Sequence, residues 1–217
     1  TKNELGKKIT VEASSSFETG SLPSEETEAV TELLNDHVII NQVYGGGNND
    51  TTPVSHSFIE LYNPTDAEID LNGYSVGYLS NGKNGKAEEE VKLALDGAKI
   101  PSHHSYLIQC EPQDAATFTG FLNIETSDKT WEQIIDNKQY RIVLYQGTKM
   151  EDAVSVNEGV VEGLALPDGT ISKQKAIRRK AFADTDNNAE DFMTVEYRDA
   201  KENLIAAYKP RSLADGA

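Results

Sequence analysis

Two apolar stretches decide the fold of this chain: Val-Ile-Ile-Asn-Gln-Val-Tyr-Gly-Gly-Gly at residues 38–47 and Phe-Ile-Glu-Leu-Tyr-Asn-Pro at residues 58–64. Each is rich in β-branched and aromatic side chains, and each ends at residues that stop a strand. They predict neighbouring β-strands joined by a wide connection. We expect this pair to found a β-sandwich.

Further strand-like segments follow at the spacing of roughly eight to twelve residues that is typical of sandwiches. They cover residues 67–71, 74–79, 90–95, 104–110, 140–145, 150–156 and 159–164, and a closing hairpin is expected within 193–207. Residues 113–121 are predicted as a short helix or a loop. In the segment 104–110, alternation places Tyr106, Ile108 and Cys110 on one face and Leu107 on the other. The pattern indicates an all-β domain.

The first 36 residues differ from this pattern. Residues 1–23 have few large apolar side chains, so a linker or the end of a preceding domain is expected there. Ser24 could cap a short acidic helix over residues 24–35. The predicted organisation is a flexible or partly helical N-terminal extension over 1–36, a sandwich over 37–212 and a polar tail over 213–217.

Net charge limits the class of partner. The chain has 20 Lys and Arg against 36 Asp and Glu, which gives a formal charge of −16. A field of this sign repels phosphate backbones and anionic lipid, so it disfavours nucleic-acid and membrane-surface binding. Since no run approaches the roughly 18 apolar residues of a membrane span, membrane insertion is not expected either.

Cysteine content and the start of the chain bear on the compartment. With Cys110 as the only cysteine, an internal disulfide and a zinc ribbon are excluded. That content fits either the cytosol or the surface of a bacterium that uses few disulfides. Because the sequence begins at Thr1, we expect a mature or excised piece of a longer protein.

An acidic loop at residues 184–191, Asp-Thr-Asp-Asn-Asn-Ala-Glu-Asp, supplies oxygen atoms of the kind that calcium binds. The candidate calcium ligands are Asp184, Asp186, Asn188, Glu190 and Asp191. The loop departs from an EF-hand, because Ala189 stands where that loop needs glycine and Val195 stands at its twelfth position. A turn whose Asp and Asn side chains bond to local backbone amides explains the same residues.

A basic stripe precedes this loop, with Lys173, Lys175, Arg178, Arg179 and Lys180 within eight residues. Such a stripe is able to bind a polyanion such as teichoic acid, DNA or an acidic glycan. The alternative is a solvated strand whose cations neutralise the acidic loop, and the acidic net charge favours it. The candidate ligand-binding residues are Tyr44, which could stack on a sugar ring, and Lys173, Lys175, Arg178 and Arg179.

Three other features favour structural roles. Glycines 45–47 lack the Gly-Lys-Ser/Thr of a phosphate loop, so positive φ angles at a strand end explain them better. The histidines His37, His56, His103 and His104 do not predict a shared ion, because the adjacent pair would face opposite ways on a strand. Cys110 has no base near it in sequence and is expected to be a small buried hydrophobe.

Several ordered blocks resemble the lamin tail domain in its bacterial secreted form. They are the two opening stretches, residues 69–76 (Ile-Asp-Leu-Asn-Gly-Tyr-Ser-Val), Ile100-Pro101 leading into 105–108, and 184–188 before Asp191-Phe192. The resemblance spans about residues 37–192. It implies an immunoglobulin-like β-sandwich, found outside the cell in bacterial multidomain proteins beside nuclease, phosphoesterase or adhesion modules. It implies no catalytic residues. Nuclear lamins place such a domain behind a long coiled coil, and no sustained heptads appear here.

The expected function is therefore a non-catalytic interaction or adhesion module, extracellular or on a bacterial cell surface. It would present loops such as 44–57 and 183–191 to a glycan, wall polymer or protein partner. One alternative is a targeting module of an extracellular nuclease or phosphoesterase. A second is a metal-dependent hydrolase that uses the acidic loop, for which the sequence offers no general base.

Overall fold

The computed structural model describes residues 12–14, 21–23, 36–47, 52–83, 85–113, 118–159, 162–199, 201 and 203–216. The chain divides into two compact units, residues 1–34 and 35–217. The first unit contains a small antiparallel hairpin of β1 (Glu12–Ser14) and β2 (Ser21–Pro23). The helix predicted over residues 24–35 lies outside the described residues.

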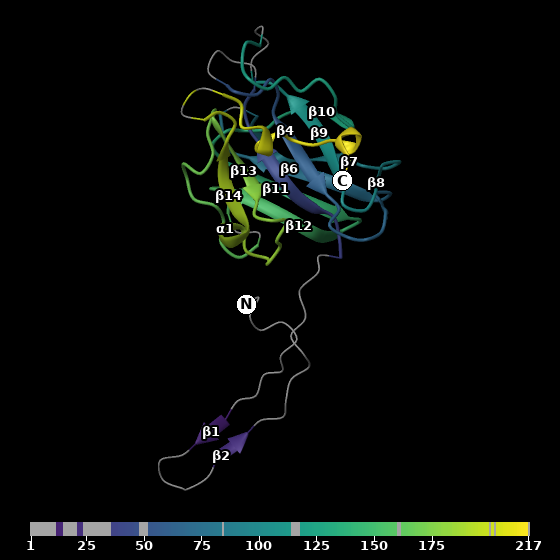
Figure 1. The fold of residues 1–217 in the computed structure, drawn as a ribbon, viewed down its shortest axis with the longest axis vertical. Coiled ribbons are helices and arrows are strands. Elements are labelled where there is room, and N and C mark those ends of the chain that lie inside the picture. Colours follow the sequence, from purple (N-terminus) through teal and green to yellow (C-terminus); the bar gives the residue numbers. More distant parts are fainter. Residues whose placement is uncertain are drawn as a thin grey trace. The chain divides into compact units, whose positions relative to one another are not determined.

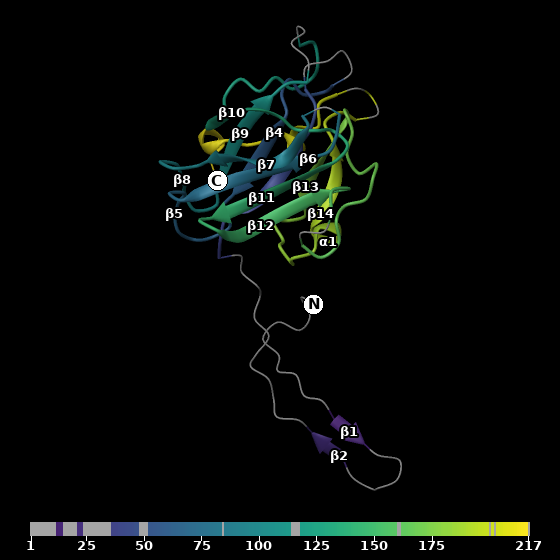
Figure 2. The ribbon, with the colours of Figure 1, turned by 180° about the vertical axis from the view of Figure 1, so that it is seen from behind.

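The second unit is built from two larger sheets (Figures 1 and 2). The six-stranded sheet has the order β10 (Lys129–Ile134), β9 (Ser105–Glu111), β4 (Phe58–Tyr62), β3 (Ile39–Tyr44), β13 (Lys175–Arg179) and β14 (Phe192–Glu196). The four-stranded sheet has the order β12 (Lys149–Val156), β11 (Tyr140–Gln146), β6 (Tyr74–Ser80) and β7 (Ala87–Ala94). Together they confirm the predicted all-β sandwich.

Short elements complete this unit. Strands β5 (Ile69–Asp70) and β8 (Lys99–Ile100) pair with each other at one end of the sandwich. The single-turn helix α1 (Asn188–Asp191) precedes β14, and two 3₁₀ turns, η2 (Ala206–Tyr208) and η3 (Leu213–Asp215), lie near the C-terminus. All strand pairs in the two larger sheets are antiparallel except β9 with β10.

The founding pair is confirmed as β3 and β4, which are antiparallel neighbours in the middle of the six-stranded sheet. A register shift between Ile40 and Gln42 marks a β-bulge. A bulge inserts one extra residue and reverses the facing of the side chains that follow it. As a result Ile40 and Val43, three positions apart, both lie in the core between the two sheets.

The outer face of the six-stranded sheet is also buried. Tyr44, Phe58 and Leu107 lie there with Leu122 and Tyr197 in a second apolar cluster, which the loops after β3 and β9 and the C-terminal segment cover. Each strand of the middle of this sheet is therefore buried on both faces, and β4 has no exposed residue. The predicted alternation in β9 is confirmed, because Tyr106, Ile108 and Cys110 face the inner core and Leu107 faces the outer cluster.

Burial on both faces encloses one carboxylate. Glu60 of β4 is fully buried on the outer side, where it accepts hydrogen bonds from Asn41 Nδ2 at 2.9 Å and Ser105 Oγ at 2.8 Å. The backbone N–H of Arg211 donates to its other oxygen at 3.2 Å. Burial raises the pKa of Glu60. The C-terminal segment is thus fastened to the sheet by a buried acid.

Several predicted boundaries were wrong. Residues 162–164 do not form the strand predicted over 159–164. Strand β10 was not predicted, and β13 was predicted only as a solvated strand, the alternative interpretation of the basic stripe. The closing hairpin is reduced to a single bridge between Arg198 and Leu204, because β14 pairs with β13 instead. The predicted polar tail also differs, since Leu213 packs against the inner core and η3 carries a capping box of Ser212 with Asp215.

The outer cluster makes a measurable contribution to stability. We expect Leu107→Ala to lower the free energy of unfolding by about 2–5 kcal/mol, as for a core leucine, because its side chain is only 3% exposed. Urea unfolding measures this value. Val91→Ala is the control, because Val91 is 38% exposed on β7 and should cost much less. A cost for Leu107→Ala as small as the control's would contradict a second core.

Candidate functional site

The basic stripe does not form an exposed surface. Arg179 is 2% exposed and Tyr44 is fully buried, with its hydroxyl donating to the carbonyl of Lys173 at 2.7 Å. Neither side chain is accessible, so both predictions of a ligand-binding role were wrong. Arg178 donates to Gln42 Oε1 at 3.1 Å and to the carbonyl of Ala207 at 3.0 Å. Lys173 and Lys175 keep some exposure, and Lys175 lies 3.9 Å from Glu196.

Arg179 is the centre of a buried ionic cluster. One terminal nitrogen, Nη2, donates to both carboxylate oxygens of Asp152, at 2.7 and 2.9 Å. The other, Nη1, donates to Asp184 at 3.1 Å and to Asp191 at 3.2 Å. Its Nε donates to the carbonyl of Ile40 at 3.1 Å. Arg179 thus neutralises the acidic loop as the alternative interpretation predicted, but its side chain is buried and not solvated.

Within the acidic loop, Asp191 fixes the backbone from beneath. Its carboxylate accepts from the N–H of Thr185 at 2.9 Å, the hydroxyl of Thr185 at 2.8 Å and the N–H of Asn187 at 3.4 Å. Asn188 turns toward β12, where it accepts from the N–H of Ser155 and donates to the carbonyl of Ala153. These local bonds are those of the predicted Asx-rich turn.

The five candidate calcium ligands do not converge. Asp184 and Asp191 bind Arg179, and Asn188 binds β12. Asp186 and Glu190 remain exposed at the surface of the loop. The five residues therefore do not surround one position in this structure, and calcium at the loop stays a prediction.

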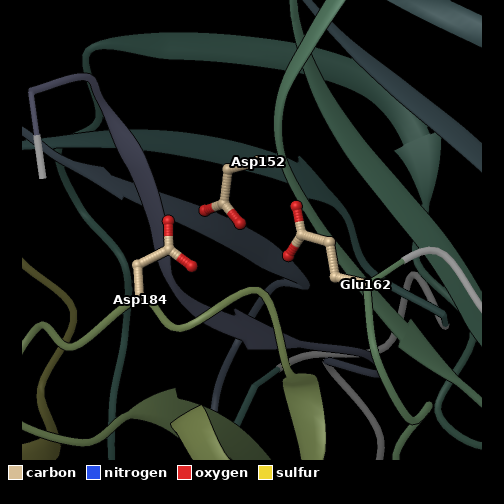
Figure 3. Close-up of side chains that lie close together, drawn as sticks. All are labelled: Asp152, Glu162 and Asp184. Carbon is tan, nitrogen blue, oxygen red and sulfur yellow. The ribbon is translucent and has the colours of Figure 1, made fainter. Parts of the chain in front are cut away.

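A different set of carboxylates does gather behind the loop. Asp152 of β12, Glu162 and Asp184 each offer one oxygen, and these atoms lie within 4.8 Å of one another. Their carboxylates point toward a common space in Figure 3. Oxygen ligands in this arrangement are those that could hold a hard cation. The guanidinium of Arg179, bonded to two of the three, already supplies positive charge at this position.

Electrostatics in the cluster favour bound protons. Burial and the neighbouring Asp152 and Asp184 raise the pKa of Glu162 to about 9. The ion pair with Asp184 at 3.3 Å raises the pKa of His37 to about 9. At neutral pH Glu162 is thus protonated and neutral, and His37 is protonated and cationic. The two cations, Arg179 and His37, then face three ionised acids instead of four.

The remaining histidines and Cys110 match their predicted structural roles. His103 lies 3.0 Å from Asp66, and His56 contacts Ser55 Oγ at 2.8 Å, so each has its own local partner. Cys110 is buried, and burial raises the pKa of its thiol. Gly46 and Gly47 have φ angles of 125° and 101°, which confirms the conformational reason for the glycine run.

The comparisons with known proteins agree with this architecture. The family model for the Lamin Tail Domain matches residues 34–159, more than half of the chain. This chain belongs to the lamin tail domain family. Lamin tail domains are immunoglobulin-like, as the observed sandwich is. No curated protein matches the chain. No helix in the part that the structure describes is long and apolar enough to cross a membrane.

The sandwich of this lamin tail domain extends past the family match. Strand β13 lies between β3 and β14 in the six-stranded sheet, although it begins after residue 159. Arg179 and the acidic loop both come from this later part. The guanidinium of Arg179 joins this later part to β3 and β12. It also lies 4.5 Å from the centre of the Phe192 ring.

Sequence reasoning missed Asp152 and Glu162. A signal existed for Asp152, which alternates with Val154 and Val156 on one face of a predicted strand, where burial of a carboxylate requires a cationic partner. Arg179 gave the matching signal two positions after the buried Ile177. Glu162 lies in an irregular segment, and nothing in its neighbourhood predicts convergence on Asp184.

Arg179 should be critical for stability. We expect Arg179→Met to lower the free energy of unfolding by about 3–5 kcal/mol, because it leaves buried carboxylates without their cation. Arg179→Lys should recover only part of this loss, since an ammonium lacks the two terminal nitrogens that bind Asp152 on one side and Asp184 and Asp191 on the other. Urea unfolding is the measurement, with the neighbouring exposed Lys180→Met as control. Equal losses for Arg179→Met and the control would contradict the central role of the cluster.

Stability should fall as pH rises toward 9. Glu162 ionises near its ordinary 4.5 in the unfolded chain and near 9 in the fold, and His37 changes from 6.5 to about 9. Between the ordinary pKa of each group and about pH 9, the folded state therefore binds more protons than the unfolded state. The free energy of unfolding decreases as the pH rises through this range.

Glu162→Gln isolates the contribution of Glu162. The amide still accepts a hydrogen bond from Asn188 but does not ionise, so the variant should lose less stability than wild type between pH 5 and about 9. Urea unfolding at intervals of pH measures the slope, and the exposed Glu132→Gln serves as control. A wild-type slope in Glu162→Gln would show that Glu162 does not hold the proton.

Proposed function

We propose that this lamin tail domain is a non-catalytic extracellular interaction module of a larger bacterial surface or secreted protein. Its two-sheet body presents the loops at both ends of β3 to a glycan, a wall polymer or a protein partner. Support comes from membership of an immunoglobulin-like family and from a surface loop that its own hydrogen bonds hold in place.

The observation that carries this proposal is the internal fastening of residues 184–191. Asp191 accepts four hydrogen bonds beneath the loop, from Arg179, from the N–H and hydroxyl of Thr185, and from the N–H of Asn187. Asp186 and Glu190 are left exposed on its outer side. A loop fixed in this way loses little conformational entropy on binding, which favours recognition. Its exposed carboxylates fit a partner with cationic or hydroxyl groups.

A targeting role beside an extracellular nuclease or phosphoesterase remains the alternative. It uses the same loops, and the neighbouring domains of the parent protein would decide between the two. The hydrolase alternative has less support, because Arg179 engages Asp184 and Asp191, two acids of the loop that such a hydrolase would use. Calcium at the acidic loop stays a prediction that the binding experiment tests.

The test is retention of the whole chain on bacterial cell-wall preparations, insoluble polysaccharides and DNA, each with calcium or with chelator. We expect retention on a wall or polysaccharide fraction and none on DNA, because a charge of −16 opposes a polyanion. Asp186→Asn with Glu190→Gln should weaken retention if the fastened loop is the contact. Loss of retention under chelator would place a calcium ion in that contact.

A matched control separates the loop from overall charge. Glu125→Gln with Glu132→Gln makes the same charge change at two exposed acids elsewhere, so its retention should equal that of wild type. Equal weakening by both pairs would mean that only net charge matters. Absence of retention on every wall and polysaccharide fraction would refute the polymer-binding form of the proposal.

A further inference from the structure

At the opposite end of β3 from the ionic cluster, two loops enclose a cavity of about 260 Å³. We call it the polar hollow; its lining residues are Asn81, Gly82 and Lys83 after β6, and Asp136, Asn137, Lys138 and Gln139 before β11. All seven are polar or glycine. Pockets for drug-sized ligands have volumes of about 300–1,000 Å³ and mostly apolar linings. The polar hollow therefore fits a smaller ligand that is recognised by hydrogen bonds and charge.

Hydrogen bonds between the two loops keep the polar hollow formed. Ser80 donates its hydroxyl to the carbonyl of Gln139 at 2.7 Å and accepts from the N–H of Gly82 at 3.0 Å. Tyr78 donates its hydroxyl to the carbonyl of Gly85 at 2.7 Å and accepts from the N–H of Asp136 at 3.0 Å. A ligand entering this cavity would meet a preorganised wall.

Two glycines make this arrangement possible. A Cβ at Gly82 would lie 2.2 Å from Asp136 Oδ2, and a Cβ at Gly45 would lie 2.0 Å from the carbonyl oxygen of Asp136. Both distances are shorter than any real contact, so the backbone of each glycine packs directly on Asp136. The glycine run that ends β3 thus supports the polar hollow from behind.

The charges of the polar hollow differ from those of the whole protein. Asp136 is 2% exposed, and its Oδ1 accepts from the N–H groups of Lys138 at 2.7 Å and Gln139 at 3.0 Å. This carboxylate is therefore committed to shaping the loop. Lys83 and Lys138 are exposed and line the cavity, so they place two cations at its opening on a chain of net charge −16. An anionic group is favoured there.

We infer that the polar hollow binds one anionic saccharide unit, with Lys83 and Lys138 pairing with its carboxylate or phosphate and the amides of the lining bonding to its hydroxyls. Amide side chains both donate and accept, which suits hydroxyl groups. No aromatic ring lines the polar hollow among the residues that the structure describes, so recognition depends on charge rather than on stacking against a neutral sugar. This inference rests on the proposed function, and it names the class of ligand for the loops at one end of β3.

The test is a titration of the whole chain, followed by amide chemical shifts in NMR. The probes are glucuronate, glucose 1-phosphate, glucose and acetate. We expect shifts at Gly82, Lys138 and Gln139 with glucuronate or glucose 1-phosphate, and much weaker binding of glucose and of acetate. A preference between the first two tells a uronate-bearing glycan from a phosphate-bearing one. Equal responses to acetate and glucuronate, or none to either anionic sugar, would overturn the inference.

Lys83→Gln with Lys138→Gln should weaken binding about tenfold, because two exposed ion pairs with the anionic group of the ligand are lost. Both side chains are exposed, so folding is not at risk. The control is Lys99→Gln with Lys149→Gln, which removes the same charge from two exposed lysines, 57% and 73% exposed, at the other end of the sandwich. Equal affinities of the two pairs of variants would overturn the inference.

The same variants keep this inference separate from the proposed function. If wild type and Lys83→Gln with Lys138→Gln are retained equally on wall polymer and neither binds anionic sugars, the polar hollow fails and the interaction module stands. Binding of anionic sugars without retention on any polymer would support the polar hollow and refute the polymer-binding function.

Discussion

The buried guanidinium of Arg179 is the interaction on which the rest of this lamin tail domain depends. Arg179 belongs to the six-stranded sheet, and the carboxylate that it binds with two bonds, Asp152, belongs to the edge strand of the other sheet. Asp152 in turn accepts from the backbone N–H of Ile40, while Arg179 donates to the carbonyl of the same residue. One ionic cluster therefore joins both sheets, the founding strand and the acidic loop.

A buried ionic group is expensive, and its geometry here shows how the cost is offset. Desolvation of a guanidinium is repaid only when nearly all of its donors are satisfied at good distances. Arg179 meets this condition with three carboxylates and a backbone carbonyl. The excess of acids is relieved by the proton on Glu162 and by His37. An apolar cluster could give the same stability, but it would not fix the loop 184–191 in one conformation.

The sequence predicted the sandwich because its apolar strands report directly on burial. The founding pair, β6, β9, β11 and β12 all have runs of side chains that fit a half-buried or fully buried pleat. Strand β10 was missed because charged residues interrupt it, and β13 was expected to be solvated although the charge of its Arg179 is part of the core. The candidate site was predictable only in part for the same reason. A local sequence pattern shows that Asp184 and Arg179 are charged. It does not show that Asp152 and Glu162, which come from distant segments, lie beside them in the fold.

The position of β13 has a consequence for how the chain reaches this fold. Its partner β3 is near the start of the sandwich, and the contact between Gln42 and Arg178 joins residues 136 positions apart. Pairings of such long range are slow to form, because the intervening chain must lose the entropy of loop closure before any stabilising contact is made. During synthesis one edge of β3, a strand without an exposed residue in the finished fold, has no partner until β13 has emerged. β3 is thus open to wrong pairing along this edge until late in synthesis, and a chaperone or rapid synthesis of the last quarter would protect it.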